Sequence, residues 1–324
     1  MTDLVAAAER VAEGAFRLEL RYRPIDAVNV LVFPETDGLV LVDTGPGADG
    51  YLEAIDQGIQ RLGLGTVDDV HRIYLTHAHT DHIGQAGAIQ HRTGAEVHAH
   101  PEAMDFFERR YIPESNDDLL AWFGAHGLPS ALLDKLAITL PTRPEAPEST
   151  LPYGERVTIQ DRPWLVIETG GHAPGHVALY QPDSGQLLAG DAVLEDIVPL
   201  IDIQPFRDHD TMHLYLEGLT RLRELDISRV LPAHGAPFAG GKDRIEVLLT
   251  KHQQRIQRVL AACAADWQSA YEIFQTSWGR RIEGLTKMRM AFGQVIGYLG
   301  YLETEHLVER DSVDGAVRFR IRTS

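Results

Sequence analysis

The stretch Thr76-His77-Ala78-His79-Thr80-Asp81-His82 decides how this sequence is interpreted. Its three histidines and one aspartate fall within six residues, on a loop between a predicted strand and a predicted helix. Alternate residues of an extended loop face the same side, so His77 and His79 can bind one ion together. Asp81 and His82 then point towards a second ion. A solvated polar loop, the alternative, does not account for four metal-binding side chains at this density, and we predict a metal site.

Four more side chains that can bind a metal follow later in the chain, namely His172, His176, Asp191 and His234. They lie beside predicted strand ends, which is where α/β proteins build their sites. A single histidine at a strand end is more often an ordinary loop residue than a ligand. In combination with the first cluster, however, these residues predict a larger site that several loops assemble.

Strand and helix signals alternate in the first 241 residues, and this alternation is typical of an α/β domain. Apolar β-branched runs predict strands, and apolar side chains at helical spacing predict helices. The predicted strands are Val28–Phe33, Leu39–Val42, Ile73–Leu75, Glu96–Ala99, Val157–Ile159, Trp164–Glu168, Val177–Tyr180, Leu187–Ala189 and Val230–Leu231, and the predicted helices are Tyr51–Leu62, Ile83–Arg92 and Thr211–Glu224. An aromatic-rich helical insertion at about residues 101–150 interrupts the alternation, either as a lid over the site or as a small core of its own.

The strand pattern stops after Gly240-Gly241. Three helices and a terminal hairpin are predicted there, which is the order of elements in a winged-helix domain. The helices span Arg244–Ala262, Ser269–Gln275 and Thr286–Glu305, and the strands span His306–Glu309 and Val317–Ile321. We therefore predict a catalytic domain over residues 1–241 and a small winged-helix-like domain over residues 242–324. The spacing of Gly293, Gly297 and Gly300 predicts close packing of the third helix, against the catalytic domain or in a homodimer.

Charge is unevenly distributed along the chain. Its 30 Lys and Arg and 47 Asp and Glu give a net charge of −17. Residues 242–324 hold 13 basic and 10 acidic side chains (+3), which leaves 17 and 37 (−20) for the first 241 residues. Such an acidic surface repels nucleic acid and anionic membranes. The exception is a group of basic side chains that form either a phosphate-binding face or an ordinary solvated one: Arg280, Arg281, Lys287, Arg289, Arg318, Arg320 and Arg322.

The remaining composition narrows the class of protein. An apolar content of 44% is that of an ordinary globular chain. The only cysteine, Cys263, excludes an intramolecular disulfide and a cysteine-built zinc or iron–sulfur site. The sequence contains no run of 18 apolar residues, so no membrane-spanning helix is predicted. Its N-terminus does not have the pattern of a signal peptide. We therefore expect a cytoplasmic protein without a membrane partner.

The series His77-x-His79-x-Asp81-His82, His176, Asp191 and His234 resembles the metal ligands of the metallo-β-lactamase superfamily, over about residues 15–240. The resemblance implies an αββα sandwich with two metal ions at one edge. It implies that His77, His79 and His176 bind one ion, that Asp81, His82 and His234 bind the other, and that Asp191 bridges both. Asp43 matches a position that usually supports the ligands. His172 matches another supporting position, or is an ordinary loop histidine.

This ligand set resembles that of glyoxalase II rather than that of the commonest β-lactamases, which bind their second metal partly through cysteine. We therefore expect a hydroxide that bridges two divalent ions to cleave a small carbonyl substrate, a thioester or an ester. Asp81 is the predicted catalytic residue, because it can orient the nucleophile or accept its proton while it binds metal. Nitrogen and oxygen ligands suit zinc, which we expect, and also iron or manganese.

The whole chain resembles superfamily members that carry a C-terminal winged helix, among them an RNA nuclease and fungal thioesterases. A single-strand RNA endonuclease is therefore the alternative function, although the charge of the first 241 residues disfavours nucleic acid. Glyoxalase II proper has a different C-terminal domain, so the resemblance does not extend to its glutathione contacts. A regulator that has lost its metals is disfavoured, because no ligand position lacks a suitable residue.

Overall fold

A computed structural model describes residues 3–22, 26–137, 145–147, 155–201, 210–278, 282 and 284–322. The chain divides into two compact units. The first consists of Met1–Phe107, Arg143–Pro199 and Gly218–Ile245, and the second of Glu108–Thr142, Leu200–Glu217 and Glu246–Ser324. Part of the predicted insertion therefore belongs to the second unit, while the domain boundary after residue 241 stays a prediction.

Six strands form the first sheet of unit one, in the order β1-β2-β3-β4-β5-β6. They span Val5–Ala12, Ala15–Tyr22, Asp26–Glu35, Gly38–Val42, Val70–Tyr74 and Glu96–His98. β1 to β4 pair antiparallel, whereas β5 and β6 run parallel to β4. The sequence predicted β3 to β6 but neither β1 nor β2. Alanine-rich β1 has a high helix propensity, which its pairing with β2 overrides.

Five strands form the second sheet of unit one, in the order β11-β10-β9-β8-β7. In chain order, β7 to β11 span Arg156–Ile159, Arg162–Glu168, Val177–Gln181, Gln186–Gly190 and Arg229–Pro232. β10 and β11 are parallel, and the other pairs are antiparallel. Every residue of β9 and β10 is buried. Burial on both faces explains why these strands are apolar runs without alternation.

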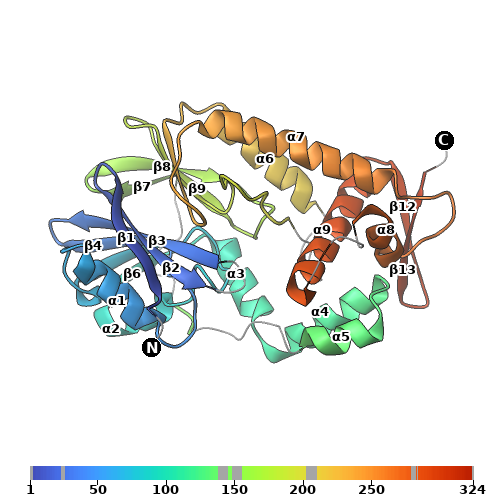
Figure 1. The fold of residues 1–324 in the computed structure, drawn as a ribbon, viewed down its shortest axis with the longest axis horizontal. Helices are drawn as coiled ribbons and strands as arrows, with labels where there is room; N and C mark the ends of the chain where they lie inside the picture. Colours follow the sequence, from blue (N-terminus) through green and yellow to red (C-terminus); the bar gives the residue numbers. More distant parts are fainter. Residues whose placement is uncertain are drawn as a thin grey trace. The chain divides into compact units, whose positions relative to one another are not determined.

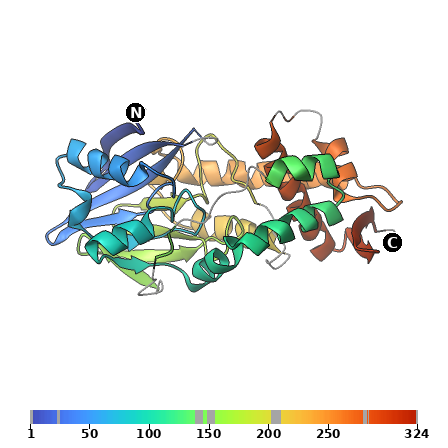
Figure 2. The same ribbon diagram turned by 90° about the horizontal axis from the view of Figure 1, so that it is seen from below.

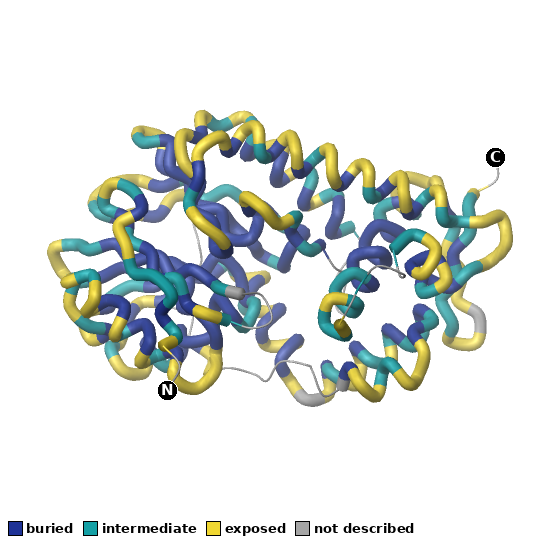
Figure 3. The backbone as a smooth tube through the Cα atoms, viewed as in Figure 1, coloured by how far each residue is buried: buried dark blue, intermediate teal, exposed yellow. Residues whose placement is uncertain are grey.

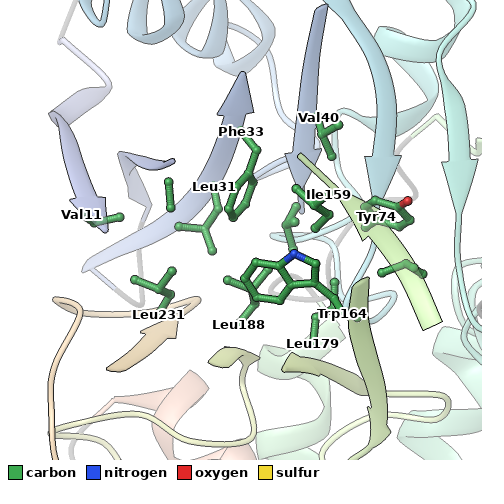
Figure 4. Packing of buried hydrophobic residues seen from close by; sticks show 13 residues of the cluster. Val11, Leu31, Phe33, Val40, Tyr74, Ile159, Trp164, Leu179, Leu188 and Leu231 are labelled. Carbon is green, nitrogen blue, oxygen red and sulfur yellow. The ribbon is translucent and has the colours of Figure 1, made fainter. Parts of the chain in front are cut away.

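The two sheets pack face to face around one hydrophobic cluster. Phe33 of β3 and Trp164 of β8 meet edge to face there, with ring centroids 6.0 Å apart (Figure 4). Leu188 of β10 and Leu231 of β11 belong to the same cluster and are almost fully buried. Burial of each such side chain contributes about 1.5–3 kcal/mol, so this layer accounts for much of the attraction between the sheets.

Helices cover the outer faces of both sheets (Figure 1). On the first sheet, α1 (Tyr51–Arg61) contacts β1 and β2, and α2 (Ala86–Thr93) contacts β5 and β6. On the second sheet, Gly218 of α6 (Thr211–Arg223) lies against Thr169. Gly241, the first residue of α7 (Gly241–Leu260), lies against Val230 of β11. The predicted αββα architecture of the first unit is confirmed.

The parallel strands of the two sheets end at a common edge of the sandwich. β4 and β5 are parallel neighbours in the first sheet, as β10 and β11 are in the second. Backbone hydrogen bonds join the sheets at this edge, from Asn29 N to Ala233 O (2.7 Å) and from Val177 N to Thr76 O (2.9 Å). The loops that follow β4, β5, β10 and β11 are therefore brought together, and these loops carry most of the predicted ligands.

The second unit is helical, with a two-stranded sheet near the C-terminus (Figure 2). It contains α4 (Pro113–Ala125), α5 (Ser130–Ala137), α8 (Ala270–Ser277), α9 (Leu285–Thr304), β12 (Val308–Val313), β13 (Ala316–Ile321) and parts of α3 (Pro101–Arg110), α6 and α7. The three predicted helices, α7 to α9, and the predicted hairpin are therefore confirmed in their order. Their identification as a winged helix stays a prediction.

The insertion forms α3, α4 and α5, and its residues 138–144 and 148–150 lie outside the described part of the chain. Phe123 of α4 packs against Phe292 of α9, with ring centroids 5.6 Å apart. Both side chains are almost fully buried. Of the two roles expected for the insertion, α4 therefore takes the packing role, as part of the core of the second unit.

Helix α7 shows how the longer helices are patterned. Its residues 241, 245, 248, 252, 256 and 259 are buried, and most of those between them are exposed, so buried and exposed colours alternate along it (Figure 3). This spacing is that of a helix with one apolar face. No helix in the described ranges is both long enough and apolar enough to cross a lipid bilayer.

His252 of α7 is fully buried in the second unit. Its Nδ1 lies 3.0 Å from the hydroxyl of Tyr298 on α9, and its Nε2 has no hydrogen-bond partner among the described residues. Tyr215 of α6 packs against the imidazole with ring centroids 5.1 Å apart. Burial, aided by the positive charge of Arg255, lowers the pKa of His252 to about 3.

We expect His252 to make the second unit sensitive to acid. The imidazole of the unfolded chain takes up a proton near pH 6.5, whereas that of the folded chain stays neutral down to a pKa of about 3. The unfolded state thus binds more protons in this range, so the free energy of unfolding falls as the pH falls below about 6.5. Thermal unfolding between pH 7.5 and pH 5 should show a shallower pH dependence for His252→Leu than for the wild type.

The matched control is His91→Leu, at an exposed position on α2. This variant should keep the pH dependence of the wild type. A pH dependence of His252→Leu equal to that of the wild type would show that the buried imidazole does not cause the acid sensitivity.

Candidate metal centre

Asp43 organises the loops that carry the predicted ligands. It follows β4 in the left-handed region, with a φ of 61°, which aspartate tolerates better than most residues. Its Oδ1 accepts a hydrogen bond from Thr76 N (2.8 Å). Its Oδ2 accepts two more, from the hydroxyl of Thr76 (2.8 Å) and from Nδ1 of His82 (2.9 Å). The buried carboxylate therefore holds one predicted ligand and the start of the histidine-rich loop.

Four of the predicted ligands have a hydrogen-bond partner at Nδ1. The pairs are His77 with Thr76 Oγ1 (3.0 Å), His82 with Asp43 Oδ2 (2.9 Å), His176 with Thr169 Oγ1 (2.7 Å) and His234 with Ala27 O (2.7 Å). When these rings are neutral, such partners place the proton on Nδ1 and leave the lone pair on Nε2 for a metal. Metal-binding histidines are usually held in this way, because a partner at one nitrogen fixes the ring and the tautomer.

Asp81, His82 and His234 converge on one point. Oδ2 of Asp81 lies 3.8 Å from Nε2 of His82 and 3.7 Å from Nε2 of His234. A tetrahedral ion with bonds of about 2.1 Å separates its ligand atoms by about 3.4 Å. Nε2 of His82 is buried and has no hydrogen-bond partner within the described residues. The spacing and the unpartnered nitrogen both fit a divalent ion at this point.

Asp191 joins this group to the other histidines. Its Oδ1 lies 3.4 Å from Nε2 of His234, and its Oδ2 lies 3.7 Å from Nε2 of His82 and 3.2 Å from Nε2 of His172. The carboxylate is almost fully buried, and Oδ1 has no hydrogen-bond donor in the described part of the chain. Such a position suits a carboxylate that binds one ion and faces a second.

The remaining histidines lie on the other side of Asp191. Nδ1 of His79 is 3.0 Å from Nε2 of His77 and 3.0 Å from Nε2 of His172, and ligand atoms of these three residues can surround one ion. The ring of His176 is also in the site, 4.9 Å from that of His77. Its Nε2, however, accepts a hydrogen bond from the backbone N–H of Asp191 (3.0 Å). All seven predicted ligands are therefore gathered in one site, together with His172.

The charges of the site are strongly coupled. Burial opposes the charged form of Asp191, but His234 and His82 hold the pKa of Asp191 well below its usual value. Burial likewise opposes the charged form of His82, yet Asp191 and Asp81 raise the pKa of His82 to about 10. By contrast, burial and the neighbouring histidines hold the pKa of His77 well below its usual value. On one side of the site, carboxylates therefore pair with charged imidazoles, and on the other side the imidazoles are neutral.

Two glycines allow the loops to approach this closely. A Cβ on Gly190, which has a φ of +50°, would lie 2.7 Å from Nε2 of His176 and 3.0 Å from Cβ of Thr76. A Cβ on Gly84, after the histidine-rich loop, would lie 2.0 Å from the backbone nitrogen of Gly47. A side chain is therefore excluded at Gly84 by the neighbouring backbone, and at Gly190 by the predicted metal ligand His176.

Some residues that surround the site were not identified as site residues by the sequence analysis. Thr76 and Thr169 each place a hydroxyl at Nδ1 of a predicted ligand. Tyr22, at the end of β2, hydrogen-bonds the side chain of Thr80, and burial together with the charge of Asp81 raises its pKa. Only for Thr76 and Thr80 did the sequence offer a clue to this position, since both lie in the histidine-rich stretch itself. Tyr22 and Thr169 are far from it in the sequence.

Phe106 of α3 lies beside the imidazoles. Its ring meets that of His79 edge to face, with centroids 6.1 Å apart, and it is almost fully buried. This aromatic side chain of the insertion therefore forms an apolar wall next to a predicted ligand. Of the two roles expected for the insertion, this contact of α3 favours the lid over the site.

Comparison with known proteins relates the site to a family. Residues 23–234 match the family model described as Metallo-beta-lactamase superfamily. A probable metallo-hydrolase of Bacillus subtilis, YqjP, is 24% identical over 306 residues, which is 91% of this chain and 93% of that protein. A hydroxyacylglutathione hydrolase of Cereibacter sphaeroides is 25% identical over 172 residues, 53% of each chain.

A solved structure shares the architecture over nearly the whole length. The metallo-beta-lactamase family protein TTHA1429 of Thermus thermophilus superposes with a TM-score of 0.82 and 29% identity, over 96% of this chain and 99% of that one. The likeness therefore extends beyond the sandwich into the second unit.

We predict that Asp43→Asn weakens metal binding. An amide in place of the carboxylate directs N–H groups at the donors of Thr76 or His82, so at least one of the three hydrogen bonds is lost. Loss of such outer partners costs about 10–100-fold in metal affinity. Titration against a competing chelator measures the effect. Asp49→Asn, at an exposed position of the same loop, should bind metal as the wild type does. Equal affinities of the two variants would contradict the role of Asp43.

Proposed function

Because the chain belongs to the metallo-beta-lactamase superfamily, and so is a metal-dependent hydrolase, we propose that it uses two divalent ions to cleave a small thioester or ester. The observation that carries this proposal is the convergence of Asp81, His82, His234 and Asp191, with nitrogen–oxygen separations of 3.4–3.8 Å. Nitrogen and oxygen donors at this spacing suit zinc, and also iron or manganese.

In this proposal, Asp81, His82 and His234 hold one ion, and His77, His79 and His176 hold the other, with Asp191 between them. His172 then has a supporting role. Its Nε2 lies 3.2 Å from Oδ2 of Asp191, so its N–H donates to the carboxylate and orients it. A nitrogen that donates this hydrogen bond has no lone pair left for a metal, whereas Nε2 of His176 has a lone pair, which an ion would take over from the backbone N–H of Asp191.

Three residues of the chain have separate roles in the proposed reaction. When bound, the ions supply a Lewis acid for the scissile carbonyl and a nucleophile from water at neutral pH. The carboxylate of Asp81 orients the nucleophile and accepts its proton, because it lies at the ligand cluster beside His82 and His234. Asp43 keeps His82 in one tautomer during turnover. Phe106 excludes water from the side of His79.

Two observations support a thioester or ester as the substrate. The apolar ring of Phe106 beside His79 suits an acyl group. One relative is named for hydrolysis of hydroxyacylglutathione, which is an acyl thioester. We expect the partner of this protein to be such a small molecule.

RNA cleavage, with the C-terminal unit as a winged helix that binds RNA, remains the second candidate. Arg318 forms an ion pair with Glu272 (3.4 Å), and Arg320 forms one with Glu309 (2.6 Å). The guanidinium of Arg320 also lies 4.4 Å from the ring centroid of Trp267. These charges are balanced within their own unit, which disfavours a phosphate-binding face. Arg280 and Arg281 lie outside the described residues.

Metal analysis of two histidine variants tests the ligand assignment. We expect His176→Ala to retain about one of the two ions, because a ligand is lost. His172→Ala should retain both, at a reduced activity, because only the orientation of Asp191 changes. Retention of two ions by His176→Ala together with loss of one by His172→Ala would reverse the two roles.

A substrate panel tests the reaction. We expect hydrolysis of acyl thioesters or esters, and little dependence of the rate on ionic strength, whereas RNA binding should weaken steeply with salt. Asp191→Asn should lower the rate by more than about 100-fold, since even the outer partners of metal ligands are worth 10–100-fold. Asp49→Asn is the matched control and should remain active. Activity on RNA alone would refute the proposal.

A further inference from the structure

Asn29 of β3 makes an unusual set of hydrogen bonds to the turn that carries His234. Its side-chain nitrogen Nδ2 donates to the carbonyl oxygens of Pro232 (2.9 Å) and Gly235 (2.8 Å). Its backbone N–H donates to the carbonyl of Ala233 (2.7 Å). One residue of the first sheet thus binds three of the four residues of a turn at the end of the second sheet.

The same strand also holds His234 itself. Nδ1 of His234 donates to the carbonyl of Ala27 (2.7 Å), which lies two residues before Asn29 on β3. The guanidinium of Arg17 on β2 donates to the carbonyl of Gly235 (3.0 Å). The turn keeps a backbone hydrogen bond to its own sheet, from Ala233 N to Gly190 O (3.0 Å), and the contacts described above come from the other sheet. They fix both the position and the ring orientation of His234.

We propose that Asn29 is a positioning residue for His234, and that its amide sets the affinity of the metal position formed by Asp81, His82 and His234. The proposal rests on the two-metal function proposed above. It follows from geometry, since both N–H groups of a 2% exposed amide are used on the turn of a single ligand. No other side chain can replace them without a change in shape or charge: aspartate lacks the donors, and alanine lacks the reach.

The other end of the amide faces the remaining part of the site. Oδ1 of Asn29 is buried and has no hydrogen-bond partner among the residues described. Asn29, Asp43 and Thr76 line a cavity of about 10 Å³ between the sheets, which is close to the minimum volume for one water molecule. Asn29 and Asp43 thus border the same small cavity, so the residue that holds the turn of His234 lies near the one that holds His82.

The effect is expected at one metal position only. His77 and His79 are held through Thr76 and through each other, and none of these contacts involves Asn29. Asp81 and His82 share their position with His234, whose turn loses two hydrogen bonds when the amide is removed. Loss of such outer partners costs about 10–100-fold in metal affinity.

Metal titration of the full-length protein tests the proposal, with zinc as the probe and two variants. Asn29→Asp keeps the volume but directs an oxygen at the carbonyls of Pro232 and Gly235, and Asn29→Ala removes the amide. The backbone bond to Ala233 remains in both. We expect both to bind the first zinc as the wild type does and the second about 10–100-fold more weakly. Excess zinc should then restore full occupancy.

The matched control is Val32→Ala, a truncation of a fully buried residue on the same strand. It should lower the unfolding temperature but leave both zinc affinities unchanged. Coupling to His234 provides a second readout: in a His234→Ala background, Asn29→Asp should cause no further loss of zinc.

Three outcomes would count against the proposal. Wild-type affinity for the second zinc in both Asn29 variants would overturn it, as would an equal loss of both ions. Fewer than two equivalents of zinc in the wild type would instead refute the proposed two-metal function, on which the inference rests. The three results are distinguishable in one titration series.

Discussion

The buried carboxylate of Asp191 is the group on which the site depends. It lies among imidazoles from three loops, and its Oδ1 has no hydrogen-bond donor in the described part of the chain. The imidazoles around it offset only part of the cost of burying this charge, and that cost falls further when a divalent cation binds. The fold therefore places a group that divalent ions satisfy, and the histidines around it complete the coordination.

The sandwich makes this arrangement possible. Each sheet supplies a pair of parallel strands, β4 with β5 and β10 with β11, whose carboxyl ends meet at one edge. Neither sheet alone carries all of the ligands. Hydrogen bonds that cross between the sheets, such as those from Asn29 to the turn after β11, therefore matter more here than in a protein whose site lies on one loop. The remainder of the core holds these two halves in register.

Local patterns in the sequence predicted the parts of the structure that local contacts determine. The spacing of His77, His79, Asp81 and His82 predicted a metal site, and the alternation of strands and helices predicted an α/β domain. The αββα sandwich was expected only from the resemblance to the metallo-β-lactamase superfamily. β1 was missed because its alanine-rich sequence favours a helix in isolation. The sequence left the role of His172 open and did not single out Asn29 as a residue of the site. Their roles depend on contacts with Asp191 and with the turn of His234, far away in the chain, which no periodicity reveals.

Anomalous X-ray diffraction from crystals of the zinc-loaded protein tests the central claim most directly. The account predicts two zinc peaks about 3.5–4 Å apart, with Asp191 bound to both, and with Asp81, His82 and His234 around one of them. A single peak, or two peaks of which neither is bound by Asp191, would contradict it.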